Sequence, residues 1–253
     1  MTELFTDHSI WLYVLAPFVI VLAYTVFGLS GFGSTVISVP ILAHWLPVTY
    51  LVPLMALLDM VSASIMGTQG RKHASYTEVK RVIPFMFLGF VVGVTVLVGV
   101  PDRFLRIALG AFAAGIGIYS LFNPVMHRSI SAWWVIPTGI VGGAVATIFG
   151  AGGPIYATYL SGRLHDKTGI RSTMSLLISI SAISRAIVYA IEGLILKAAV
   201  LTGFVVLAPF VWIGLTIGNR IHVGLSQQQM RRAIGGVLIL TGGSLFVRAV
   251  VSA

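Results

Sequence analysis

The sequence predicts an all-α integral membrane protein made of two halves of inverted topology, and three observations predict it. The 253 residues are 57% hydrophobic and only 9% charged, with a mean hydropathy of +1.00. Soluble domains carry about 25% charged residues, so no soluble domain of any size fits in this chain. Apolar segments recur along the whole chain, and a short glycine break interrupts the series at two matched places.

Ten apolar segments are expected, eight of them long enough to span. A full crossing needs about 20 residues. The segments 34–47 and 154–162 are too short for an easy crossing, and each follows a glycine break. We therefore predict that these two are half-helices or re-entrant segments. The expected segments are 10–29, 34–47, 49–69, 82–100, 104–122, 132–149, 154–162, 172–191, 198–218 and 233–251.

The two halves of the chain align with each other at two offsets. At an offset of 119 residues, Gly31 matches Gly150 and Gly33 matches Gly152. Further along the chain the halves align at an offset of 125 instead, and this change of offset indicates an insertion after Arg185. We expect a first repeat over residues 1–126 and a second over 127–253, which together form one membrane domain. At the offset of 125 the matched pairs are Gly93 with Gly218, Arg106 with Arg231, Gly110 with Gly235, and Gly117 with Gly242.

The basic residues predict the orientation in the membrane. Eleven Lys and Arg lie in the loops 70–81, 123–131, 163–171 and 219–232, and four lie on the opposite side. Because basic loops remain in the cytoplasm, both termini are predicted to be periplasmic. Corresponding loops of the two halves then fall on opposite sides of the membrane. Inverted repeats of this kind are typical of secondary transporters.

Composition also argues against several other functions. Cysteine is absent, which excludes disulfides and thiolate metal sites, and the histidines show no metal-binding spacing. The chain has no Walker loop, no paired carboxylates and no nucleophile with a base, so we expect neither an enzyme nor a cofactor. We attribute the net charge of +9 to cytoplasmic loops rather than to nucleic-acid binding.

The two glycine breaks are the predicted substrate site. They are Gly31-Phe32-Gly33-Ser34 and Gly150-Ala151-Gly152-Gly153, and Pro154 suits the first turn of the helix after the second break. Glycine lets the backbone approach a ligand closely, and the free N–H groups of a helix start attract anions. The alternative is that these glycines only pack helices tightly. The residues predicted to bind substrate are Gly31, Gly33, Ser34, Thr35, Gln69, Gly152, Gly153, Tyr156 and Arg185.

Arg185 and Asp59 are charged residues expected deep inside spans. An arginine in the bilayer is costly and normally faces a cavity or a partner, and its planar fork suits sulfonate, sulfite or carboxylate. Substrate binding, an ion pair with Asp59 and interfacial snorkelling all remain open for Arg185. Asp59 is a candidate proton relay, cation ligand or counter-charge. Further candidate hydroxyl donors are Ser30, Ser34, Thr35, Ser62, Ser181 and Ser184, and Tyr156 and Tyr159 are candidates to line the path or to join an aromatic belt.

The sequences around the two breaks are also similar to those of a known protein family. The chain resembles the TauE/SafE sulfite-exporter family of bacterial membrane permeases through Gly28-Leu-Ser-Gly-Phe-Gly-Ser-Thr-Val-Ile-Ser-Val-Pro40 and Gly150-Ala-Gly-Gly-Pro154. The second motif departs from the family pattern of Gly-x-Gly-Gly-Gly, because Pro154 takes the last place. The resemblance implies movement of sulfite, sulfonates or related small anions across the bacterial inner membrane.

We therefore expect a multi-pass secondary transporter for a small sulfur-containing anion, coupled to protons and working by alternating access. The alternatives are an uncoupled anion channel and a membrane subunit of a redox or biogenesis complex. The expected partners are the anion and the lipid bilayer, and a homodimer is left open. The exact substrate and the direction of transport do not follow from the sequence.

Overall fold

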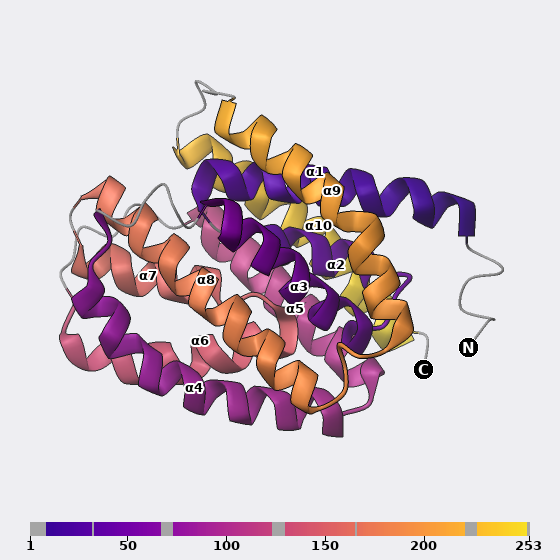
Figure 1. Cartoon of the computed structure of the whole chain (residues 1–253), viewed down its shortest axis with the longest axis horizontal. Coiled ribbons are helices and arrows are strands. Elements are labelled where there is room, and N and C mark those ends of the chain that lie inside the picture. The colour runs from indigo at the N-terminus through magenta and orange to yellow at the C-terminus, as the bar shows by residue number, and fades with distance from the viewer. Residues whose placement is uncertain are drawn as a thin grey trace.

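The computed structural model describes residues 9–31, 33–66, 73–122, 130–164, 166–220 and 227–251. Within these ranges the chain forms ten α-helices and no strand (Figure 1). The first half contains α1 (Ser9–Ser30), α2 (Ser34–Leu42), α3 (Val48–Met66), α4 (Tyr76–Gly99) and α5 (Asp102–Phe122). The second contains α6 (Val135–Phe149), α7 (Gly153–Arg163), α8 (Lys167–Ile191), α9 (Ala198–Arg220) and α10 (Gln227–Val251), with a short 3₁₀ turn, η3 (Ala132–Trp134), before α6.

Several predicted boundaries differ from those observed. The helices expected to begin at residues 82 and 233 begin at Tyr76 and Gln227, and two further differences have a local cause. The segment expected to reach residue 47 ends as a helix at Leu42, because a turn follows directly. The segment expected to begin at residue 172 begins at Lys167, because the side chain of Asp166 caps the helix by accepting hydrogen bonds from the N–H groups of Thr168 and Gly169. Hydropathy alone misses this polar first turn.

Six helices of the described chain are long and apolar enough to cross a membrane, against eight expected. Two further apolar stretches, Val14–Leu29 within α1 and Val48–Ala63 within α3, lie below this length in the part of the chain that the structure describes. Large apolar side chains point outward from α4, α5, α9 and α10. A water-soluble monomer rarely exposes apolar surface on this scale, so these faces contact lipid. Examples are Phe87, Val91, Phe104, Ile118, Val205, Trp212, Leu240 and Val247.

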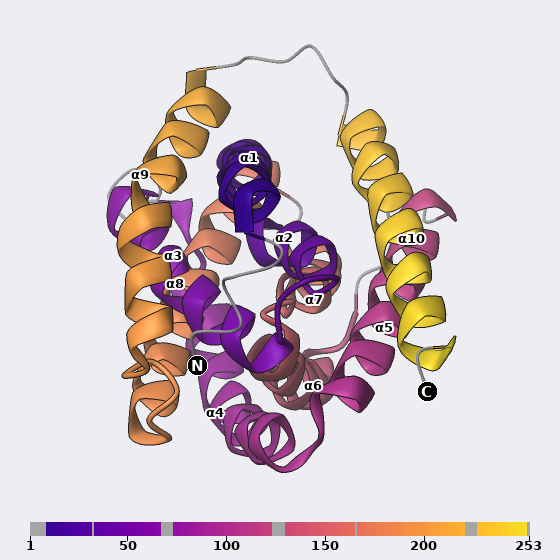
Figure 2. The ribbon, with the colours of Figure 1, turned by 90° about the vertical axis from the view of Figure 1, so that its right-hand side faces the viewer.

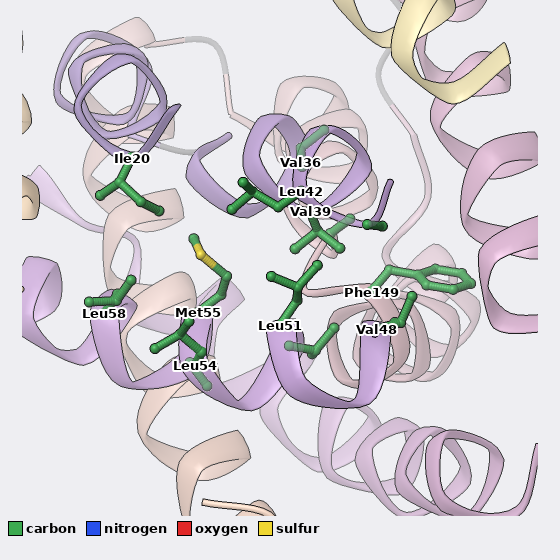
Figure 3. Packing of buried hydrophobic residues seen from close by; sticks show 14 of the residues in the cluster. Ile20, Val36, Val39, Leu42, Val48, Leu51, Leu54, Met55, Leu58 and Phe149 are labelled. Atoms are coloured by element: carbon green, nitrogen blue, oxygen red, sulfur yellow. The ribbon is translucent and has the colours of Figure 1, made fainter. Parts of the chain in front are cut away.

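The broken and central helices lie inside the bundle. Figure 2 shows α9 and α10 on opposite flanks, with α2, α3, α7 and α8 between them. Eight of the nine residues of α2 are buried. Val39 of α2 packs toward α3, and Val36 and Leu42 belong to the same continuous apolar core (Figure 3). The short helices are therefore enclosed by longer ones rather than exposed to lipid, which is the setting that a broken membrane helix requires.

Glycines set the closest helix–helix contacts on one flank. A Cβ added at Gly214 of α9 would lie 2.6 Å from the carbonyl oxygen of Val21 in α1, and one added at Gly218 would collide with the carbonyl of Thr25. The residue numbers rise together in the two helices, so α1 and α9 run parallel.

The same contact occurs between α4 and α6. A Cβ added at Gly89 of α4 would collide with the carbonyl of Ile140 in α6, and one added at Gly93 would lie 2.8 Å from the carbonyl oxygen of Ala144. These helices also run parallel. Small residues allow this close approach of two backbones within a membrane.

The third close pair, α5 and α10, runs in opposite directions. A Cβ at Gly110 would lie 2.8 Å from the carbonyl oxygen of Gly242, whereas one at Gly117 would lie 2.7 Å from that of Gly235. The numbers rise in α5 as they fall in α10, so this pair is antiparallel.

Candidate functional site

The first glycine break separates α1 from α2. α1 ends at Ser30 and α2 begins at Ser34. Gly31 has φ of 79° and Gly33 has φ of 107°, a left-handed conformation that L-residues other than glycine rarely adopt. Among the hydrogen bonds between described residues around the break, the first from an N–H of α2 is that of Ile37, which donates to Gly33 at 3.1 Å. The helix start at Ser34, Thr35 and Val36 therefore offers its N–H groups to the interior.

The second break separates α6 from α7. α6 ends at Phe149, and Gly150 turns the chain with φ of 70°. Gly152 then caps α7, and a proline occupies its first turn, where a missing N–H costs nothing. The local sequence thus explains both the end of one helix and the start of the next.

The two breaks meet each other. A Cβ added at Gly150 would collide with the side-chain methyl of Thr35 in α2, and it would lie 3.5 Å from Nη1 of Arg185 in α8. Segments more than 100 residues apart in sequence therefore share one small space. No side chain other than hydrogen fits at this point of closest approach.

A small buried pocket occupies the space between the breaks. It contains most of the predicted site residues: Gly33, Ser34, Thr35, Gly152, Gly153, Tyr156 and Arg185, together with Asp59. Gly31 is not part of its lining; it lies under the side chain of Arg171, which donates to the carbonyl of Gly28 at 2.7 Å. Gln69 lies outside the described residues. The remaining lining residues are Phe27, Val36, Ala146, Gly150, Ile178 and Ser181.

Arg185 reaches into this pocket from the middle of α8 and is only 2% exposed. Its Nη1 donates to the carbonyl oxygen of Ala146 at 2.9 Å, and its Nε donates to that of Ser181 at 3.3 Å. Nη2 lies 3.3 Å from Oδ2 of Asp59. The side chain therefore turns inward and forms the ion pair with Asp59, which is one of the three alternatives that the sequence left open, and interfacial snorkelling does not describe it. A guanidinium has five N–H groups, which leaves donors for a further acceptor.

Asp59 is surrounded by donors. Oδ1 accepts from the hydroxyls of Tyr24 at 2.8 Å and Ser34 at 2.9 Å, and Oδ2 accepts from the hydroxyl of Thr35 at 3.0 Å as well as from Arg185. The carboxylate is 2% exposed. Its acceptor capacity is largely used, so the groups that remain to meet a ligand are mainly donors. Such a lining favours an anion over a cation.

Tyr24 was not anticipated as a site residue. It lies on α1, before the break, and only the folded structure brings its hydroxyl to Asp59. Serine, threonine and tyrosine are common in membrane helices, and nothing in the sequence distinguishes the few whose hydroxyls donate to Asp59. The carbonyl of Ala146 was missed for a similar reason, although it lies one turn before the predicted break at Gly150.

A second charged cluster lies at the far end of α7. Glu78 of α4 accepts from Arg81 at 3.0 Å and from Arg163 at 3.1 Å, and Tyr159 also donates to it. Tyr159 therefore belongs to this cluster and not to the pocket. The cluster fixes the end of α7 that is remote from the break.

A helical membrane protein in which two broken helices meet at a buried pocket that holds an Arg–Asp ion pair has the architecture typical of secondary transporters. The chain belongs to the sulfite exporter TauE/SafE family, whose family model matches residues 16–245. The resemblance drawn from the two glycine motifs is thus confirmed, and the chain falls in a family of membrane transporters rather than enzymes. Its apolar helices and its family together make it a multi-pass inner-membrane protein.

Two curated relatives cover most of the chain. The "Probable inner membrane transporter protein TsaS" of Comamonas testosteroni is 24% identical over 194 residues, which cover 76% of this chain and 81% of that protein. The "Probable sulfite/organosulfonate exporter TauE" of Cupriavidus necator is 26% identical over 225 residues, or 87% of each chain. No solved structure gives a significant match.

Proposed function

We propose that this protein is a secondary transporter for a small sulfur-containing oxyanion, such as sulfite or an organosulfonate, and that the pocket between the breaks is its substrate site. The observation that carries the proposal is the donor-rich lining, in which two helix starts and Arg185 face one buried space. The family and the substrates in the name of the Cupriavidus relative support the choice of a sulfur oxyanion. Anions bind at helix starts because free N–H groups and the helix dipole both favour negative charge.

We infer that residues 1–126 and 127–253 are inverted repeats. The contact of Gly214 with Val21 has a counterpart in the contact of Gly89 with Ile140. Gly89 and Gly214 are 125 residues apart in the sequence, and Val21 and Ile140 are 119 residues apart. These are the two offsets at which the halves of the sequence align. Equivalent residues of the two halves thus make equivalent contacts, as a two-fold relation between the halves requires.

The direction of the two-fold axis follows from α5 and α10. At the offset of 125, Gly110 in the first half corresponds to Gly235 in the second, and Gly117 corresponds to Gly242. If the halves are exchanged, the contact of Gly110 with Gly242 becomes the contact of Gly235 with Gly117. Both contacts are present, so the axis passes between these two helices. A two-fold axis that relates antiparallel neighbours is perpendicular to them. Since the helices cross the membrane, the axis lies in its plane, which supports the inverted arrangement and a substrate site where the halves meet.

Charge balance supports coupling to protons. The charges of Arg185 and Asp59 cancel in the buried pair. A monovalent anion that enters the pocket would leave one uncompensated negative charge inside the membrane, which is costly. Protonation of Asp59 would remove that charge, and it would also free Nη2 of Arg185 for the anion. Asp59 is therefore our candidate for the coupling residue.

Transport by the purified protein in liposomes tests this function. We expect saturable sulfite uptake that an imposed pH gradient drives. In Asp59→Asn, which keeps the side-chain shape without a titratable group, we expect the pH gradient to have no effect. Uptake that rises linearly with concentration and ignores pH in the wild type would favour an uncoupled channel. Absence of transport by the protein alone would favour a subunit of a larger complex.

A further inference from the structure

Tyr156 has a buried hydroxyl with no partner. The residue lies in the first turns of α7 and lines the pocket, and its side chain is 1% exposed. Within the described part of the chain, its hydroxyl is the one buried side-chain polar atom that makes no hydrogen bond. A buried polar group without a partner destabilises the folded state by about 1–3 kcal/mol. An exception of this kind at a candidate site requires an explanation.

Neighbouring buried tyrosines do have partners. Tyr24 donates to Asp59, Tyr189 donates to the carbonyl of Thr147, and Tyr159, one turn further along α7, donates to Glu78. The fold therefore provides an acceptor for each of these hydroxyls but provides none for Tyr156. The difference is specific to the side chain that faces the pocket.

The ring of Tyr156 is held in place by two glycines. A Cβ at Gly142 of α6 would collide with one edge of the ring, and a Cβ at Gly152 would lie 3.0 Å from the other edge. The ring thus fits between two backbones and has little freedom to turn its hydroxyl elsewhere. Arg185 lines the same pocket as this ring.

We propose that the Tyr156 hydroxyl is a specificity-determining donor that remains unpaired until an oxyanion binds. This rests on the proposed function of the pocket. Donors reach the pocket from three elements: Arg185 from α8, Tyr156 from α7 and the free N–H groups at the start of α2. A head group with three oxygens on one atom, such as sulfonate or sulfite, offers each of them an acceptor. The two oxygens of a carboxylate can also accept several hydrogen bonds, but their lone pairs lie in one plane, whereas the three oxygens of a sulfonate or sulfite form a pyramid that faces three separate elements.

The test compares methanesulfonate with acetate, which share a methyl group and a charge of −1 but differ in the number of oxygens. In Tyr156→Phe, binding of methanesulfonate by the purified protein should weaken about tenfold or more, as loss of a charge-assisted hydrogen bond implies. Binding of acetate should change far less. The ligand-free variant should melt at the same temperature as the wild type or higher, because the unpaired hydroxyl has been removed.

Tyr159→Phe is the matched control. It removes the hydrogen bond to Glu78, so it should lower the melting temperature and leave the affinity for methanesulfonate unchanged. If Tyr156→Phe binds methanesulfonate as the wild type does, or weakens both anions equally, the role of Tyr156 is overturned while the pocket keeps its function. If wild-type protein binds neither methanesulfonate nor sulfite, the proposed function itself fails, and the inference fails with it.

Discussion

At the scale of single residues, Arg185 pairs with Asp59, and a double-mutant cycle separates this structural role from the anion-binding role that we propose. We expect Arg185→Ala to lower the affinity for sulfite by about 10-fold to 100-fold, because a charge-assisted hydrogen bond contributes roughly 1.5–3 kcal/mol. We also expect lower stability, because removal of one partner of a buried pair leaves the other charge stranded and costs about 3–5 kcal/mol. Arg185→Lys keeps the charge, so it should retain part of the binding.

The cycle is completed by Asp59→Ala and by the double variant. The double variant should recover much of the stability lost in Arg185→Ala, since no unpaired charge remains, but it should not recover sulfite binding. Melting temperature and affinity would be measured on all four proteins. Recovery of stability together with unchanged affinity in Arg185→Ala would mean that the arginine is only a structural partner of Asp59.

At the scale of elements, the proposed substrate site depends on contact between the two glycine breaks. Gly150→Ala should abolish transport, because its Cβ would collide with the methyl of Thr35 and because φ of 70° strains any residue with a side chain. Thr35→Ser removes that methyl but keeps the hydroxyl that donates to Asp59. The double variant Gly150→Ala with Thr35→Ser should therefore recover part of the transport in liposomes.

Gly115→Ala on α5 is the control for this pair. A Cβ at Gly115 would meet no atom within 4 Å, and its backbone is helical, so transport should be unaffected. If Gly150→Ala transports normally, the breaks tolerate a side chain at their contact and do not define a tight site.

Some residues of the site could be predicted from the sequence, and others could not. Glycine clusters and buried charges are rare in apolar segments, so the sequence identified both breaks and singled out Arg185 and Asp59, but it left open whether these two residues pair. Hydroxyl residues are common, so nothing distinguished Tyr24, whose hydroxyl converges on Asp59. Tyr159 was grouped with Tyr156 from its place in the sequence, but helical geometry directs it to Glu78 instead.

At the scale of the whole molecule, the parallel and antiparallel helix pairs are all compatible with the orientation expected from the basic loops. Arg81 and Arg163 lie at the end of the bundle where α4 begins and α7 ends, on the left of Figure 1. Arg103 begins α5 and Arg248 ends α10 on the opposite side. We therefore predict that a reporter fused at Ala253 is periplasmic and that one inserted in loop 163–171 is cytoplasmic. A cytoplasmic carboxyl terminus would contradict the predicted orientation.

We propose that an oxyanion binds between the two glycine breaks, and the position of the bound anion can be measured directly. Crystals of the protein soaked in selenite, a selenium analogue of sulfite, would give an anomalous diffraction signal at the bound anion. We expect one peak enclosed by the start of α2, the start of α7 and Arg185, and loss of that peak in Arg185→Ala. A selenite peak elsewhere in the molecule, with none in the pocket, would contradict it.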